Sequence, residues 1–496
     1  MNERDSQHVG CGCDDGLCRR DFLAAVGTTF GAATLSAFHA PAEAVVEPLA
    51  KKQGASVRAV FLYPPSKTFA DDPDGWWSWP GNFFDAEGKQ KKFTAALREM
   101  EKKLGMKIIV DEKPVANADD AQRLAKELQA SRPDGLLLIM LFNRSLAQAE
   151  LLLNAAEGVK MPAVFYIDLG VKHGPVAQYR RPGVYFIQSL ENFRAIEYGM
   201  TMINAKKLIG QSKILSINEA KEPSEIAEPF LGTKVRVIPF PQYVEVFHKV
   251  AIDEEARKFI TAFTGPAKEI RNVSQEALEN AARAHFALKS LLAAEGADGV
   301  TMNCLRRGML KPCISFATIN NELIPAACEN DVPAALTQLL GRLLLGRPGF
   351  QHNPAFETER NHYYASHCTC PTKIYGPDRG ELTYILRRFA HSNEGSCAIQ
   401  VLWKEGDPVT MVRYYPGKTP LLDVYSGKVF RSHAMPPAGG CCTNVEIEIT
   451  DRTDACSVGG HHNLLFYGDD AQRFRLFAQL YRLRLGNTAF QGTEPV

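Results

Sequence analysis

The chain has 496 residues, and its 57 Lys and Arg residues nearly balance its 56 Asp and Glu residues. This balance gives no electrostatic reason to bind nucleic acid or an anionic membrane surface, so we expect neither as a partner. A neutral or weakly charged small molecule fits the composition better, and the length allows about three domains with sizeable cores.

The N-terminus carries two adjacent arginines, Arg19 and Arg20, before a Gly- and Ala-rich stretch that ends near Ala37. Small residues follow up to Ala44. This arrangement resembles a twin-arginine export signal at 1–44 that is cleaved after Ala44. It implies a periplasmic or extracellular protein. The alternative is a disordered cytoplasmic tail.

From position 57 the pattern alternates short apolar strands with amphipathic helices, which is typical of a parallel α/β layer. The expected elements are strands at 57–63, 107–110, 135–142 and 163–167 and helices near 91–104 and 119–130. We assign them to an N-terminal α/β domain at 45–185. The longest apolar run, 135–142, is too short for a membrane span, so we expect no stable membrane insertion.

A second α/β set begins near 184–187, and we place a second domain at 186–346. Its expected elements are helices at 191–208, 256–263, 275–295 and 334–345 and strands at 212–217, 235–238 and 299–302. Short strands separated by turn residues then indicate a β-rich domain at 347–496, closed by a helix at 471–484. The predicted fold class is therefore α/β: two Rossmann-like α/β domains followed by a β-rich C-terminal domain.

The cysteines do not form an obvious framework. Nine of them lie between 304 and 456, and an odd number argues against complete disulfide pairing. Cys368 with Cys370, and the adjacent Cys441 and Cys442, lack the two-residue gaps of common structural zinc sites. We interpret them as buried thiols or as one disulfide.

Aromatic residues crowd the loop after the first expected strand, where Trp76, Trp77 and Trp79 stand close to acidic residues. Loops that leave the carboxyl ends of parallel strands often bind ligands. Flat aromatic faces can stack on sugar rings, so Trp77 and Trp79 are candidate sugar contacts. They can equally pack a subunit interface.

Two further segments offer polar groups at the end of an apolar run. Glu329 and Asp331 share one face if the strand before them extends through both residues. Asp331 can instead cap the helix that follows, since proline stands at its start. His367, in Ser366-His367-Cys368-Thr369, either joins a site or is a satisfied core group.

The last motif is Gly459-Gly460-His461-His462-Asn463, which precedes an apolar run at 464–467. Glycines allow a tight turn, and the following strand would hold the imidazoles rigidly, as at a metal site. Neighbouring residues of an extended segment point to opposite faces. At most one of the two histidines is therefore expected to be a metal ligand, and the other a hydrogen-bonding neighbour.

Together these motifs resemble the L-fucose isomerase and L-arabinose isomerase superfamily. The resemblance lies in Cys328-Glu329-Asn330-Asp331, in His367-Cys368-Thr369, and in Gly460-His461-His462 with Tyr467-Gly468-Asp469. It implies interconversion of an aldose and a ketose, here a fucose- or arabinose-like monosaccharide, through an enediol. It also implies a divalent metal cofactor, typically Mn²⁺, and a homo-oligomer.

Carried onto this sequence, the resemblance makes Asp331 and His462 metal ligands and Glu329 an acid or base. His367, His461, Asn463, Trp77 and Trp79 would face the sugar. The family usually supplies another acidic ligand some two dozen residues before the Asp331 position, but 303–308 contains no carboxylate and includes Arg306 and Arg307. Glu329 can substitute as a ligand. Alternatively, the protein binds a carbohydrate outside the cytoplasm without catalysis.

Overall fold

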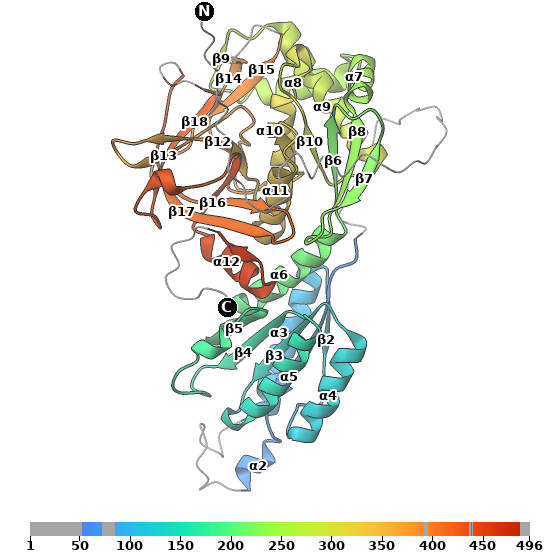
Figure 1. The fold of residues 1–496 in the computed structure, drawn as a ribbon, viewed down its shortest axis with the longest axis vertical. Coiled ribbons are helices and arrows are strands. Elements are labelled where there is room, and N and C mark those ends of the chain that lie inside the picture. Colours follow the sequence, from blue (N-terminus) through green and yellow to red (C-terminus); the bar gives the residue numbers. More distant parts are fainter. Residues whose placement is uncertain (1–51, 72–84, 390–394, 436–437, 439, 487–496) are drawn as a thin grey trace, which may run out of the picture.

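The structure is a computed structural model that describes residues 52–71, 85–389, 395–435, 438 and 440–486. It combines parallel α/β sheets with a C-terminal β-barrel, which confirms the predicted class at that level (Figure 1). The predicted export signal at 1–44, and Trp77 and Trp79, lie outside the described residues.

The first sheet contains five parallel strands in the order β2-β1-β3-β4-β5. They are β1 (Ser56–Leu62), β2 (Lys107–Val110), β3 (Gly135–Met140), β4 (Ala163–Asp168) and β5 (Val184–Ser189). This is the doubly wound order of flavodoxin-like sheets rather than the Rossmann order. The helices here are α2 (Lys67–Ala70), α3 (Ala86–Leu104), α4 (Ala118–Ser131) and α5 (Leu146–Gly158). Every side chain of β3 is buried, as expected for a central parallel strand.

The predicted boundary between 185 and 186 is wrong, because β5 hydrogen-bonds to β4 and completes the first sheet. A run of apolar residues does not reveal which sheet a strand joins.

The second sheet has the order β11-β10-β6-β8-β7. Its strands are β6 (Lys213–Asn218), β7 (Ser224–Ala227), β8 (Lys234–Pro239), β10 (Gly299–Met302) and β11 (Ala326–Cys328), and all but β7 are parallel. The helices of this region are α6 (Phe193–Gly210), α7 (Phe240–Lys249), α8 (Glu254–Thr264), α9 (Gln275–Glu295), α10 (Cys313–Asn321) and α11 (Val332–Leu345). The end of β11 lies beside the later β-rich region, because Cys328 exchanges hydrogen bonds with the Gln351 side chain at 2.7 and 3.3 Å.

Six antiparallel strands close into a barrel, because the terminal strands β16 and β17 also pair with each other. Around the barrel they are β16 (Pro408–Tyr415), β19 (Asn463–Tyr467), β12 (Phe350–Glu357), β13 (His362–His367), β18 (Thr443–Ile449) and β17 (Leu421–Ser432). The short β20 (Arg484–Leu485) adds to β17, and α12 (Ala471–Leu480) precedes it. Closure leaves few exposed strand edges.

A fourth sheet, of three strands, joins the second α/β region to the barrel region. It contains β9 (Glu269–Arg271), β14 (Tyr384–Arg388) and β15 (Cys397–Val401), with β14 in the middle. Because β9 comes from before the predicted boundary at 346 and β14 from after it, the two regions share backbone hydrogen bonds.

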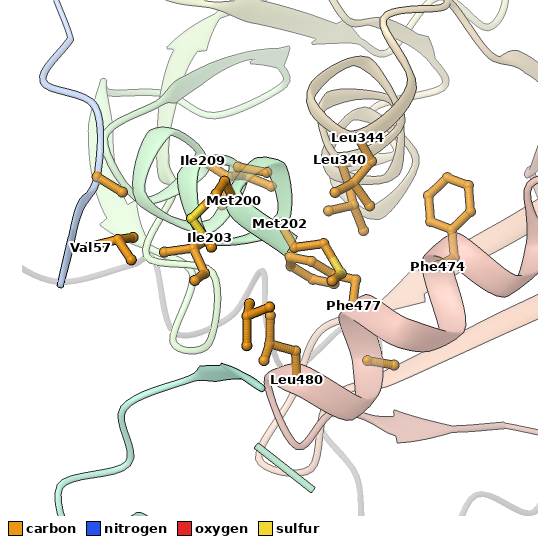
Figure 2. Close-up of a cluster of buried hydrophobic side chains, with 14 of the residues drawn as sticks. Val57, Met200, Met202, Ile203, Ile209, Leu340, Leu344, Phe474, Phe477 and Leu480 are labelled. Atoms are coloured by element: carbon orange, nitrogen blue, oxygen red, sulfur yellow. The ribbon is translucent and has the colours of Figure 1, made fainter. Parts of the chain in front are cut away.

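Helix α6 lies at the junction between the first sheet and the rest of the molecule (Figure 1). Figure 2 shows side chains from three helices meeting there: Met200, Met202 and Ile203 of α6, Leu340 and Leu344 of α11, and Phe477 and Leu480 of α12. One apolar core therefore runs from the first sheet to the barrel. Within the described part of the chain, the helices all lack the combined length and apolar character that crossing a bilayer requires.

The contact between α11 and the barrel is close enough to test. A Cβ atom added to Gly341 of α11 would lie 2.2 Å from ring carbons of Phe466, which is fully buried in β19. We expect Gly341→Ala to lower the free energy of unfolding by about 2 kcal/mol, because overpacking outweighs the better helix propensity of alanine. Urea unfolding measures the change.

The matched control is Gly158→Ala in the last turn of α5, where an added Cβ meets nothing within 4 Å. This substitution should leave stability unchanged or raise it by up to about 1 kcal/mol. Equal effects at both positions would contradict the packing of α11 on β19.

Candidate metal centre

A sharp turn at the end of β11 presents Glu329. The strand stops at Cys328, and Glu329 and Asn330 both adopt left-handed backbone conformations, with φ of 61° and 55°. Asn330 fixes the turn: its N–H donates to the carbonyl of Met302 at 2.9 Å, and its side chain accepts from Ser216 Oγ at 2.7 Å. The strand therefore does not extend through Asp331, and the shared face predicted for the two acids does not form.

Two barrel strands bring His367 and His462 together. β13 ends at His367, and β19 begins directly after His462. β13 pairs with the second half of β12, through Asn353, and β19 with the first half, through His352. One strand thus ends where the other starts, and the two imidazole centroids lie 5.5 Å apart.

Glu329, His367 and His462 converge on one point. One ligand atom from each lies within 4.8 Å of the other two, and no other trio among the described residues meets this condition. The Glu329 carboxylate oxygens lie 3.8 Å from His367 Nε2 and 3.3 Å from His462 Nε2.

Both imidazoles are almost completely buried, yet neither Nε2 atom makes a hydrogen bond among the described residues. Buried polar atoms without partners are rare. Two imidazole nitrogens and one carboxylate suit Mn²⁺, Fe²⁺ or Zn²⁺. The residues present therefore fit a divalent metal ion, and the cluster can hold one.

Asp331 is not part of this cluster but contacts His462 on the other side of the ring. Its Oδ1 accepts the Ala334 N–H at 2.9 Å, so it caps α11 as the alternative interpretation predicted. Its Oδ2 lies 2.8 Å from His462 Nδ1 and 2.9 Å from Arg413 Nη1. With both oxygens occupied, Asp331 is placed to orient His462 rather than to bind the metal, and it favours the tautomer whose Nε2 is a ligand.

The electrostatics match this arrangement. Contacts with His367 and His462 hold the pKa of Glu329 well below its usual range. Burial tends to raise the pKa of Asp331, but the bond from His462 and the charge of Arg413 outweigh it and lower the value to about 2. Burial tends to lower the pKa of His462, but the hydrogen bond to Asp331 and the nearby charge of Glu329 raise it overall. Both carboxylates are thus ionised at neutral pH.

The remaining candidates separate into exposed and buried groups. His461 is exposed, and its ring centroid lies 4.1 Å from that of His462. The rings lie side by side because His462 has a left-handed φ of 63° instead of extended geometry. Asn463 is fully buried and donates to Tyr363 and to the Gly459 carbonyl, so its position does not support the predicted sugar contact.

The segment at 303–308 adds no residue to the trio of Glu329, His367 and His462. Asn303 donates to Glu219 at 2.8 Å, and Arg307 forms an ion pair with the same carboxylate. The Arg307 guanidinium also stacks over Phe240, 3.8 Å from the ring centroid. The side chain of Arg306 is exposed. The cations that the sequence placed near the predicted acidic ligand therefore do not fill the site.

The sequence analysis missed Arg413. This residue stands in β16 among apolar neighbours and is 8% exposed. A charged residue at an inward position of a buried strand requires a partner, and that signal was available in the sequence.

No family model matches the chain, and no curated protein matches it. Among solved structures, the chain is weakly similar to GanP, a glucose-galactose binding protein from Geobacillus stearothermophilus, at 11% identity over 59% of this chain and 89% of that chain, with a TM-score of 0.17. A mutant XylFII-LytSN complex gives 9% identity over 59% of this chain and 92% of that chain, with a TM-score of 0.14. Likenesses this weak carry no argument about the site.

The Asp331–Arg413 pair is the first target for mutation. Asn is as good a helix cap as Asp, so Asp331→Asn removes the charge and leaves Arg413 buried without its ion pair. We expect a loss of about 3 kcal/mol in the free energy of unfolding, because breaking one side of a buried pair leaves an uncompensated charge. Glu329→Gln, where the side chain is 20% exposed, should cost less than about 1 kcal/mol.

The Asp331–Arg413 pair should also make the free energy of unfolding depend on pH. The pKa of Asp331 is about 2 in the folded chain, against 3.8 for the unperturbed group. Its contribution is therefore complete above pH 3.8 and is lost as the pH falls towards 2. The stability difference between wild type and Asp331→Asn, measured by urea unfolding, should shrink below about pH 4. It should also decline as the pH rises above 6.5, because Asp331 contributes to the raised pKa of His462. A difference that grows as the pH falls below 4 would contradict this assignment.

Proposed function

We propose that this protein is a metal-dependent sugar isomerase that interconverts the aldose and ketose forms of a fucose- or arabinose-like monosaccharide. Its cofactor is a divalent cation, Mn²⁺ by preference, held by Glu329, His367 and His462. The observation that carries the proposal is the convergence of one carboxylate and two buried imidazole nitrogens from three distant segments. The motifs shared with the L-fucose and L-arabinose isomerase superfamily supply the reaction.

A divalent ion held by these three side chains would have coordination positions left for other ligands. A bound divalent cation polarises neighbouring sugar oxygens and so favours proton removal from the adjacent carbon. Glu329 remains ionised because its pKa is depressed, and its partial exposure opens the cluster to solvent on that side.

Proton transfer between adjacent sugar carbons needs a group beside the substrate. His461 is exposed and lies against the ring of His462, so it is the candidate to carry that proton. Asp331 acts indirectly: it fixes the orientation of His462 and its pairing with Arg413 keeps it ionised.

One observation favours a second function, an exported carbohydrate-binding protein without catalysis. Glu329 is the single carboxylate of the described metal cluster, and the segment at 303–308 supplies no second acid. The isomerase reaction normally uses a base separate from the metal ligands, so this site depends on His461 for that role. Export through the twin-arginine pathway and assembly into a homo-oligomer belong to the same proposal and rest on the sequence motifs.

Metal binding is tested by isothermal titration of the apo protein with Mn²⁺. Wild type should bind one ion per chain. His462→Ala and Glu329→Ala should each remove most of the affinity, and Asp331→Asn should weaken it by about 10- to 100-fold, as expected of a residue behind a ligand.

The control is His433→Ala, since His433 bonds to Glu446 at 2.7 Å and is not part of the cluster. It removes the same ring from another Glu–His contact, so it should bind Mn²⁺ like wild type. Equal affinity in wild type and Glu329→Ala would overturn the metal centre.

Catalysis is tested separately by incubating the Mn²⁺-loaded protein with L-fucose or L-arabinose in D₂O and following ketose and deuterium incorporation by NMR. Turnover that falls at least about 100-fold in His461→Ala, with Mn²⁺ affinity unchanged, supports the isomerase and the proton-carrying role. Sugar binding without turnover identifies the binding protein instead.

A further inference from the structure

Four thiols gather beside His367. Cys313 begins α10, Cys368 follows His367 directly, and Cys441 and Cys442 precede β18. Cys313, Cys368 and Cys442 belong to one small apolar cluster, and Cys441 packs against it. Of these, Cys313 and Cys441 are the two whose thiols interact with that of Cys368. All four are reduced in the structure.

The sulfur atoms of Cys313, Cys368 and Cys441 do not surround a common point. Within the described residues, Glu329, His367 and His462 form the only trio of ligand atoms that lie within 4.8 Å of one another. Since Cys368 touches both of its neighbours, the two outer sulfurs must lie apart. This arrangement suits pairwise chemistry at Cys368 and not a three-thiolate metal site.

Solvent access distinguishes the two possible pairs. Cys313 and Cys368 are 3% and 5% exposed, whereas Cys441 is only partly buried. Thiol–disulfide exchange begins at a sulfur that the oxidant can reach. Cys441 is therefore the entry point, and Cys368 is the thiol that resolves the first product.

The backbone holds Cys441 in this position. Its N–H donates to Ser366 Oγ at 3.0 Å, and its carbonyl accepts from Asn444 Nδ2 at 2.8 Å. Ser366 Oγ in turn donates to Asn444 Oδ1 at 2.7 Å. These bonds tie Cys441 to β13 and β18 and so keep it next to Cys368.

We propose that Cys441 and Cys368 are a redox modification site that a small dialkyl disulfide of the glutathione type converts into an intramolecular disulfide. The Cys441 thiolate attacks one sulfur of the small disulfide, which forms a mixed disulfide and releases one small thiolate. Cys368, as it loses its proton, attacks the Cys441 sulfur and expels the second. Two protein thiols are oxidised, the small disulfide is reduced to two thiols, and the two protons from the cysteines go to those products.

The cross-link joins the two strands at the candidate metal centre. His367 pairs with Thr443 in the ladder between β13 and β18. The next step of this register places Cys368 opposite Cys442, with Cys441 one residue further along. A disulfide between Cys368 and Cys441 therefore fixes the end of β13 and with it the backbone of His367. The oxidation itself needs no metal, and its test is independent of the proposed isomerase.

The test treats the folded full chain with oxidised glutathione and maps disulfides by mass spectrometry of unreduced proteolytic peptides. The Cys456→Ser background removes an exposed thiol from the reaction. A peptide linking Cys368 to Cys441 is expected as the main intramolecular product. It should be absent from Cys441→Ser and from Cys368→Ser, and it should persist in Cys313→Ser.

A second readout is the thermal midpoint. Oxidised protein should melt several degrees above reduced protein, because the cross-link restricts the unfolded chain, and this shift should vanish in Cys441→Ser. Glutathione left on Cys441 without a cross-link, or a disulfide between Cys313 and Cys368, would overturn the proposal.

Discussion

The buried carboxylate of Asp331 is the interaction on which the site depends. It caps α11, pairs with Arg413 of the barrel strand β16, and holds the His462 ring. Three elements from different parts of the fold therefore meet at one side chain. The second α/β region and the barrel cannot shift against each other without breaking at least one of these bonds.

Burying such a group is unfavourable unless its partners compensate. Asp331 and Arg413 are 9% and 8% exposed, so both charges are largely removed from water. A pair of this kind stabilises a fold only if the remaining hydrogen-bonding capacity is also used. Arg413 meets that condition in part: its Nη1 also donates to the His462 carbonyl at 2.8 Å, whereas its buried Nε has no hydrogen-bond partner among the described residues. The guanidinium thus fixes the backbone of His462 while the carboxylate fixes its ring.

Strained backbone conformations also occur at this site. Glu329, Asn330 and His462 all have left-handed φ, which ordinary side chains adopt at some energetic cost. Such conformations persist where surrounding contacts determine them, and here the bonds of Asn330, Asp331 and Arg413 supply those contacts. Relaxing either turn would move Glu329 away from the imidazoles. The left-handed turns and the buried Asp331–Arg413 ion pair therefore act together to position the cluster.

Much of the fold was accessible from the sequence because its signals are local. Alternating apolar runs and helical periodicity gave the parallel strands, and α9 and β10 match their expected limits. The hairpin β12–β13 was not predicted, since residues such as His352 and Asn353 interrupt its apolar pattern. Strand partnership was also beyond local patterns, which is why β5 was assigned to the wrong sheet.

For the site as well, the sequence predicted the local features and not the ones that depend on the three-dimensional arrangement. The family resemblance predicted Glu329, Asp331 and His462 around the metal, with His367 facing the sugar. The structure instead brings Glu329, His367 and His462 together and places Asp331 beside His462. Their roles depended on a single backbone detail, the end of β11 at Cys328. Had the strand continued, Asp331 would have shared a face with Glu329. Because of the left-handed turn, Asp331 instead caps the start of α11. Glu329, the more exposed acid, therefore joins the cluster, and Asp331, the more buried acid, holds His462 in place. Sequence periodicity cannot resolve a two-residue turn, yet that turn decides which carboxylate reaches the metal position.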